Sequence, residues 1–308
     1  MPDINLQYLR RNEIDIIKWD RCIDEAANGE IYAYSWYLDI MASSWDALIL
    51  GDYEAVMPLP GRSKYGIKYV YQPAFTAALG VFGKNISSNL IMDFINAVSE
   101  KFRLVEISMN EGNLLDEKVP SVVLCNNFVL DLSPQYSELF NNYRNNIRRN
   151  VQKAQQYGCY FKVGIRVDEV IQLSESHMRN VTNVKAGDYV RLRKLYNFLL
   201  ERKQAMSYGI YTSTHQLVAS CIFFFSHNKA YYIVVGNHPN GKTLGASHLL
   251  IDRFIHEHAG EKLILDFEGS DIPGLAFFYS SFNAVRKTYP ALRINRLPLW
   301  IKLLKKLK

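Results

Sequence analysis

Residues 263–282 decide the fold of this chain and read LILDFEGSDIPGLAFFYSSF. The segment Leu263–Phe267 is a strand-sized, mostly apolar run, and Gly269 follows it as a turn signal. Pro273–Phe282 is apolar and largely aromatic, and its proline suits the first turn of a helix. The stretch therefore predicts a strand, a short polar turn and a helix.

The segments around this stretch predict a mixed sheet covered by helices. We expect further strands at Tyr160–Val167, Tyr208–Thr212, Val218–Phe225, Ala230–Val235 and Arg293–Arg296. We expect further helices at Asp168–Val181, Asp188–Gln204 and Gly245–Glu257. The order β-α-α-β-β-β-α-β-α-β mixes antiparallel neighbours with a crossover, so the predicted fold class is mixed α/β.

The first part of the chain predicts strands and turns with few helices. Ala47–Leu50 and Tyr53–Leu59 are apolar runs separated by Gly51-Asp52, which predicts a hairpin. A helix is expected at Ser88–Phe102, and other strands at Lys68–Gln72, Leu104–Met109 and Val122–Leu132.

A helix is predicted over Ser133–Gly158, with proline near its start and glycine past its end. Its apolar residues recur at three- and four-residue steps, at Phe140, Tyr143, Ile147, Val151 and Ala154. We interpret this segment as a bridge between two modules.

Composition limits the class of protein. At 308 residues and 48% hydrophobic residues, the chain can bury a large core and is long enough for two domains. The four cysteines lie far apart, which predicts free thiols and no metal site. We expect a cytoplasmic protein, because no signal segment or membrane-spanning run is evident.

The net charge of +6 is concentrated at the end of the chain. Residues 284–308 hold eight of the 36 Lys and Arg and no acidic residue, which leaves 28 basic against 30 acidic residues elsewhere. This distribution argues against a broad DNA-binding face.

Several short motifs together resemble the FemAB-like acyltransferases, and the element order resembles the GNAT acyltransferase fold. The motifs are Leu265–Ser270 (LDFEGS), Phe278–Phe282 (FYSSF), Gly245–Leu250 (GASHLL) and the basic run Arg144–Arg149 with Lys153-Ala154. The resemblance implies two tandem GNAT-like modules, here residues 1–132 and 159–308, joined by the basic helix 133–158. The chain departs from the family in having Asn283 after Phe282, where glycine is usual, and in lacking a coiled-coil arm.

The resemblance also implies a reaction. FemAB enzymes move an aminoacyl group from aminoacyl-tRNA to an amine of a cell-wall precursor, whereas other GNAT enzymes use acetyl-CoA. We therefore expect no tightly bound cofactor, and either aminoacyl-tRNA or acetyl-CoA as the donor. A non-catalytic binding protein on the same fold is the third alternative.

The candidate catalytic residues are Asp266, Glu268 and Tyr279. Asp266 and Glu268 alternate with apolar residues, so on a strand they would share a face, where either could take a proton from an attacking amine. The alternative is a solvated strand end. The resemblance implies that Tyr279 protonates the leaving group; as one of 20 tyrosines, it could equally be a core residue.

Two further sets are candidate ligand contacts. The resemblance implies a phosphate site at a turn before a helix, made by Lys242, Gly245, Ala246 and Ser247, although an ordinary turn would use the same residues. Cations at i,i+4 spacing on the bridging helix could bind tRNA or a diphosphate-bearing precursor, or form a solvated face; they are Arg144, Arg148, Arg149 and Lys153.

The tail Leu297–Lys308 combines leucines with four lysines. This composition is typical of a helix that lies on an anionic membrane surface, or of a terminal helix that docks on the body. The first alternative would place the protein at the inner face of the membrane and suit a lipid-linked acceptor.

Overall fold

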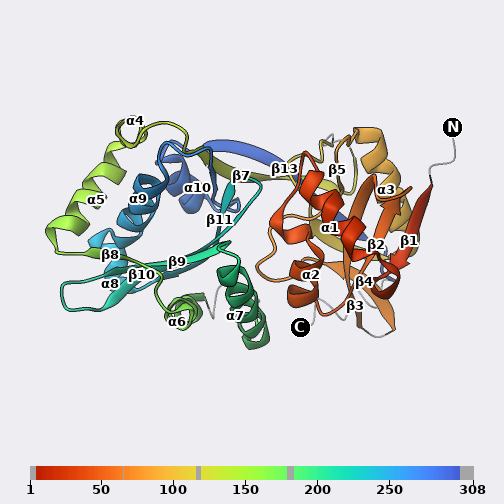
Figure 1. The fold of residues 1–308 in the computed structure, drawn as a ribbon, viewed down its shortest axis with the longest axis horizontal. Helices are drawn as coiled ribbons and strands as arrows, with labels where there is room; N and C mark the ends of the chain where they lie inside the picture. The colour runs from red at the N-terminus through yellow and green to blue at the C-terminus, as the bar shows by residue number, and fades with distance from the viewer. Residues whose placement is uncertain (1–4, 65, 116–118, 179–183, 299–308) are drawn as a thin grey trace. The chain divides into compact units, whose positions relative to one another are not determined.

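A computed structural model describes the chain except for residues 1–4, 65, 116–118, 179–183 and 299–308. The chain forms two compact units (Figure 1). Unit 1 comprises the residues up to Cys125 together with those from Thr288 onward, and unit 2 is Asn126–Lys287. The observed division therefore differs from the predicted one, because residues 133–158 lie within unit 2 and the final strand returns to unit 1. The predicted tail helix falls mostly outside the described residues.

The sheet of unit 1 has the strand order β1-β2-β3-β4-β6-β13. These strands are Leu6–Arg10, Trp45–Leu50, Ala55–Lys64, Ile67–Tyr71, Leu104–Ser108 and Val285–Asn295, and β5 (Phe82–Gly83) pairs with β3. The helices are α1 (Ile16–Glu25), α2 (Ser35–Met41) and α3 (Ser88–Lys101). Neighbouring strands are antiparallel, except for the parallel pair β4 and β6.

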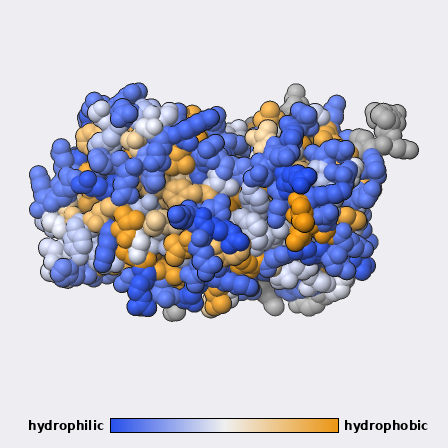
Figure 2. All heavy atoms as spheres, viewed as in Figure 1, coloured by the Kyte–Doolittle hydropathy of each residue, from blue (hydrophilic) through white to orange (hydrophobic). Residues whose placement is uncertain are grey.

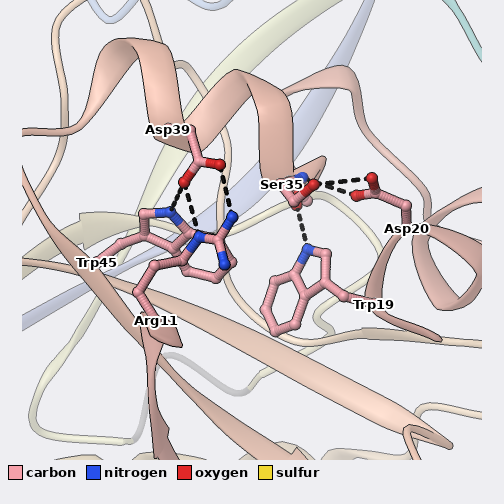
Figure 3. Close-up of polar contacts among 7 residues, drawn as sticks. Arg11, Trp19, Asp20, Ser35, Asp39 and Trp45 are labelled. Atoms are coloured by element: carbon pink, nitrogen blue, oxygen red, sulfur yellow. Dashed lines mark hydrogen bonds and ion pairs between the residues drawn. The ribbon is translucent and has the colours of Figure 1, made fainter. Parts of the chain in front are cut away.

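A carboxylate on α2 fastens the N-terminal part of unit 1 (Figure 3). Asp39 accepts two hydrogen bonds from the guanidinium of Arg11, at 2.7 and 2.6 Å, and one from the indole N–H of Trp45, at 2.8 Å. Burial alone would raise the pKa of Asp39, but these donors and the charge of Arg11 hold it below its usual value. The bidentate contact fixes the segment after β1 against α2 and β2.

A second carboxylate caps α2 from a neighbouring helix. Asp20 on α1 accepts from the backbone N–H of Ser35 at 2.7 Å and from its hydroxyl at 2.8 Å (Figure 3). The adjacent Trp19 donates its indole N–H to the carbonyl of Ala33 at 2.8 Å. Together these contacts satisfy backbone groups that a short buried helix would otherwise leave unpaired.

The sheet of unit 2 has the strand order β7-β12-β11-β10-β9-β8. These strands are Val122–Asp131, Ile264–Asp266, Lys229–Asn237, Leu217–Ser226, Ala205–Tyr211 and Tyr160–Val163. The helices are α4 (Tyr136–Asn141), α5 (Asn145–Gln156), α6 (Val167–Met178), α7 (Ala186–Glu201), α8 (Pro239–Leu244), α9 (Ala246–His258) and α10 (Pro273–Ser280). Helices α5 and α9 lie on one side of the sheet, and α6 and α7 lie on the other (Figure 1). The predicted mixed α/β class is confirmed.

The predicted helix Ser133–Gly158 is interrupted, and this part of the prediction is wrong. The chain leaves the helical conformation at Arg144, whose backbone N–H donates to the carbonyl of Ser281 at 2.9 Å. The buried ring of Tyr143 packs edge-on against Phe282 at 5.2 Å. Because of these contacts with Ser281 and Phe282, residues 133–158 form two helices, α4 and α5, instead of one.

Figure 2 shows one face of the molecule as largely hydrophilic, with hydrophobic atoms in separate patches. None of the described helices is both long enough and apolar enough to span a bilayer.

Candidate active site

The candidate site lies in unit 2, where two parallel strands separate. Strands β11 and β12 pair over only three residues, Lys229–Tyr231 with Ile264–Asp266. Beyond this point β12 ends, whereas β11 continues to Asn237 beside β10. An extra residue in β11, Ile233, shifts the register against β10 and bulges the strand. The end of β12 is therefore no longer paired with β11 beyond Asp266.

The turn that leaves β12 is held by side chains. Asp266 is buried, and its Oδ1 accepts from the backbone N–H of Glu268 and from Asn127 Nδ2, both at 2.9 Å. Asn127 on β7 in turn accepts from the backbone N–H of Gly269 at 2.6 Å and of Phe128 at 2.7 Å. Asp266 and Asn127 therefore fix the path of the chain, and nothing in the sequence pattern pointed to Asn127.

Glu268 does not lie on the strand, so the expectation that it shares a strand face with Asp266 is wrong. The strand ends at Asp266, and Glu268 adopts a left-handed conformation with φ +65°, followed by Gly269 at φ +87°. A left-handed glutamate is disfavoured, because its Cβ crowds the backbone. Its side chain is partly exposed, unlike that of the buried Asp266. The backbone strain thus presents one carboxylate at the end of the strand.

Tyr279 on α10 lies close to Glu268. It is 7% exposed and stacks on Phe267 with ring centroids 4.5 Å apart. Burial, with a further contribution from the charge of Glu268, raises the pKa of Tyr279 to about 12. Its phenol therefore stays protonated at neutral pH and can donate a hydrogen bond or a proton.

The aromatic packing continues from Phe267 to β11. The ring of Tyr232 on β11 meets Phe267 edge-on at 6.1 Å, and burial raises the pKa of Tyr232 well above its ordinary value. These rings keep water from the buried side of Tyr279. The arrangement therefore offers an accessible carboxylate as an acceptor and a shielded phenol as a donor, the two groups that general acid–base catalysis needs.

The predicted phosphate site is partly covered. Lys242 lies in α8, and Gly245, with φ +80°, ends that helix and begins α9. A Cβ at Gly245 would lie 2.6 Å from the carbonyl oxygen of Asn150 on α5, and Ala246 is fully buried. Ser247 donates its hydroxyl to Asn237 at 2.5 Å. The packing of α5 thus accounts for the glycine without a ligand, although Gly245 provides no side-chain cap for α9.

His248 in the first turn of α9 is a neutral, mostly buried imidazole. Burial lowers its pKa to about 4, and its ring meets Phe278 on α10 edge-on at 5.0 Å. Nε2 lies 3.4 Å from Asn150, whereas the buried Nδ1 has no hydrogen-bond partner among the described residues. His248 therefore joins α5, α9 and α10 beside the candidate site.

The four cationic residues predicted to contact a ligand all lie on helix α5 or at its N-terminus. Arg144 is the residue just before α5, and its guanidinium lies 5.2 Å from the centre of the Phe277 ring. Arg148 donates a hydrogen bond to the side-chain oxygen of Asn145 at 2.6 Å. Arg149 is exposed and Lys153 is half-buried. Within the described ranges, none of these four residues forms an ion pair. Their charge is therefore available to an anion.

All four cysteines are free. The described residues contain no group of three or more His, Cys, Asp or Glu side chains that could hold a metal ion.

Residues 141–271 match the family described as an acetyltransferase (GNAT) domain. The matched range contains the diverging strands, the Gly245 turn and Glu268, so this part of the chain is similar to a GNAT-type acetyltransferase domain. The predicted resemblance to GNAT-fold acyltransferases is confirmed.

Solved structures extend the likeness of fold over nearly the whole chain. FemX is similar with a TM-score of 0.62 and 11% identity, over 98% of this chain and 99% of FemX. L-PGS from Bacillus licheniformis has a TM-score of 0.53 and 12% identity, over 95% of both chains. A protein of unknown function from Bacteroides thetaiotaomicron has a TM-score of 0.58 and 10% identity, over 94% of this chain and 99% of that one. No curated protein sequence matches the chain.

Proposed function

We propose that this chain is a FemAB-like acyltransferase that moves an aminoacyl group from aminoacyl-tRNA to an amine, with a cell-envelope precursor as the acceptor. The main observation in support of acyl transfer is that Glu268 lies near the shielded phenol of Tyr279. Glu268 is partly exposed and has a strained backbone conformation. Strain of this kind concentrates at functional sites.

The proposed reaction is a direct attack. The amine attacks the carbonyl carbon of the aminoacyl ester, while Glu268 accepts a proton from the amine nitrogen. The bond to the ribose oxygen breaks, and the phenol of Tyr279 supplies a proton to that oxygen. Binding both substrates in one site lowers the entropic barrier, so no covalent enzyme intermediate is required.

Three features support aminoacyl-tRNA as the donor. The cations on α5 have no acidic partners among the described residues, which suits a phosphate backbone. The turn at Gly245, which a CoA pyrophosphate would use, is packed against Asn150. The likeness to FemX covers both units rather than the GNAT domain alone.

An acetyl-CoA-dependent N-acetyltransferase is the second candidate, favoured by the match of residues 141–271 to an acetyltransferase domain. A non-catalytic role is the third, because Tyr279 is almost fully buried.

Thermal unfolding of the full chain with a mixed aminoacyl-tRNA pool, and separately with acetyl-CoA, tests the donor. A saturating donor should raise the Tm by several degrees, since a ligand at 100 times its Kd stabilises a protein by about 2.7 kcal/mol. We expect this shift with aminoacyl-tRNA, a smaller one with deacylated tRNA, and none with acetyl-CoA. A shift with acetyl-CoA alone would assign the acetyl donor, and no shift with any of the three would favour a non-catalytic protein.

A further inference from the structure

Strand β7 continues to hold the chain after β12 has ended. The backbone N–H of Phe267 donates to the carbonyl of Phe128 at 3.0 Å. Three residues later, the backbone N–H of Ser270 donates to the carbonyl of Asn126, also at 3.0 Å. The segment 267–270 therefore lies along β7, although it is no longer part of a strand.

Between these two contacts the facing segments differ in length. Glu268 and Gly269 are the two residues on one side, and Asn127 is the single residue on β7. Two residues opposite one, with the first in a left-handed conformation, are the arrangement of a β-bulge. Bulges next to active sites redirect a side chain, and here the redirected side chain is the candidate carboxylate of Glu268.

The side chain of Asn127 holds both residues of this bulge. Its Oδ1 accepts from the backbone N–H of Gly269 at 2.6 Å, and its Nδ2 donates to Asp266 Oδ1 at 2.9 Å. The same oxygen of Asp266 accepts from the backbone N–H of Glu268 at 2.9 Å. One bulge N–H is thus bound by Asn127, and the other by a carboxylate that Asn127 contacts.

An amide suits position 127 because one end of it accepts hydrogen bonds and the other end donates them. Asn127→Asp would keep the acceptor for Gly269 but would place a second carboxylate beside the buried Asp266. Asn127→Ala would leave the N–H of Gly269 without this partner and remove a donor from Asp266.

We propose that Asn127 is a positioning residue for acyl transfer, which holds the carboxylate of Glu268 where it can accept the proton of the attacking amine. The inference rests on the proposed function, because Asn127 acts through Glu268. A base has to lie within hydrogen-bond reach of the proton that it takes, and a displacement of about 1 Å can cost about 100-fold in rate. Since a left-handed glutamate is disfavoured, the turn should relax once Asn127 no longer holds it.

Amide hydrogen exchange measures the positioning without any substrate. In Asn127→Ala, the amide hydrogens of Glu268 and Gly269 should exchange about tenfold faster or more, because the turn opens locally more often. Exchange in the middle of α9 should stay the same.

The matched control is Asn28→Ala in unit 1. Asn28 is also half-buried, accepts from the backbone N–H of Gly83 at 3.2 Å and donates to the carbonyl of Val81 at 2.8 Å. The control should lower the free energy of unfolding in urea to a similar extent as Asn127→Ala. It should leave exchange at Gly269 and kcat unchanged, because it does not touch the turn.

The rate of transfer shows whether Asn127 acts through Glu268. With a mixed aminoacyl-tRNA pool as donor and glycinamide as the acceptor amine, Asn127→Ala should lower kcat by about tenfold to hundredfold and change KM for the donor by less than about twofold. In a chain that already carries Glu268→Gln, Asn127→Ala should lower kcat by less than about twofold, since the carboxylate that it positions is gone. A merely structural role would lower kcat by the same factor in both backgrounds.

Unchanged exchange at Gly269, unchanged kcat in Asn127→Ala, or equal losses in both backgrounds would overturn the inference. A large loss in Glu268→Gln would then leave the proposed function standing. Full kcat in Glu268→Gln, or no transfer by the unmodified chain, would reject the proposed function and this inference with it.

Discussion

At the scale of single residues, Glu268 tests the proposed chemistry. A positioned base contributes about 100- to 10,000-fold to turnover, so Glu268→Gln should lower kcat by a factor in that range. The free energy of unfolding in urea should stay the same, because the backbone conformation and side-chain size are kept. Glu201→Gln, at the exposed end of α7, is the control and should leave kcat unchanged. Full activity of Glu268→Gln would reject the site.

The backbone of Glu268 gives a second test. Because φ is +65°, Glu268→Gly should relieve strain and raise the free energy of unfolding by up to about 1 kcal/mol, partly offset by the greater entropy of the unfolded glycine. Activity should fall as far as in Glu268→Gln. If Glu268→Gly is more stable and less active, the glutamate side chain serves function at the expense of stability. If the variant is less stable, the side chain has a structural role.

Tyr279→Phe distinguishes the two donors. A thiolate leaving from CoA waits for the proton of the phenol, whereas a ribose hydroxyl has other proton sources. The loss in kcat should therefore be smaller with aminoacyl-tRNA than with a thioester donor, measured with each donor that binds. Because the pKa of Tyr279 is about 12, its deprotonation should not limit turnover near neutral pH. Equal, complete retention of activity with both donors would remove Tyr279 from the mechanism.

His248 should make the fold sensitive to acid. Its pKa is lowered to about 4 in the folded chain, below the ordinary value of 6.5, so the unfolded chain binds the proton more tightly. The stability conferred by the neutral ring is present above pH 6.5 and is lost as the pH falls toward 4. Urea unfolding of His248→Gln should show a flatter dependence over this range than the unmodified chain. Parallel curves would contradict the assignment.

At the scale of elements, the cations of α5 predict a salt-dependent contact. Replacing Arg148 and Arg149 by Ala should weaken donor binding about tenfold or more at low salt and much less at high salt, because counterions already screen exposed charges. Equilibrium binding of the aminoacyl-tRNA pool across a salt series measures this. Lys194→Ala on α7 with Arg202→Ala at its C-terminal cap is the matched control. Equal affinities for both variants would leave α5 as a solvated face.

The elements with a long, regular pattern were predictable from the sequence. Helix α5 buries Ile147, Val151 and Ala154 as its spacing predicted, and α9 begins after Gly245 as expected. The interruption at Arg144 was not predictable, because it follows from a contact with Ser281, which is far away in the sequence. Lys242 was expected in a turn before α9, yet it lies in the short helix α8.

The candidate site was predictable in its residue types but not in its geometry. The alternation of Asp266 and Glu268 predicted one shared face, because a period-two pattern over a few residues cannot reveal a left-handed turn. Asn127, which holds that turn, comes from β7, and no local pattern connects it with residues 266–269. The clustering of cations on α5 was local and therefore followed from the sequence.

At the scale of the whole molecule, unit 1 should depend on the returning strand β13. Residues 291–295 of β13 pair with β6, Leu292 is fully buried, and Leu297 packs against Leu104. A fragment ending at Cys125 leaves β6 without this partner, so we expect it to lack a cooperative unfolding transition. Joining residues 288–298 to Cys125 by a flexible linker should restore the transition in urea, whereas a scrambled 288–298 segment should not. Cooperative unfolding of the shorter fragment would contradict this.

The return of β13 to unit 1 also sets an order of events during synthesis. Unit 2 is encoded as an insertion within unit 1, between Cys125 and Thr288. As the ribosome releases the chain from its N-terminus, all of unit 2 emerges before the strand that β6 requires. Unit 1, whose synthesis begins first, is therefore completed last. Until β13 has been translated, β6 and the apolar residues next to it lack the strand that pairs with them.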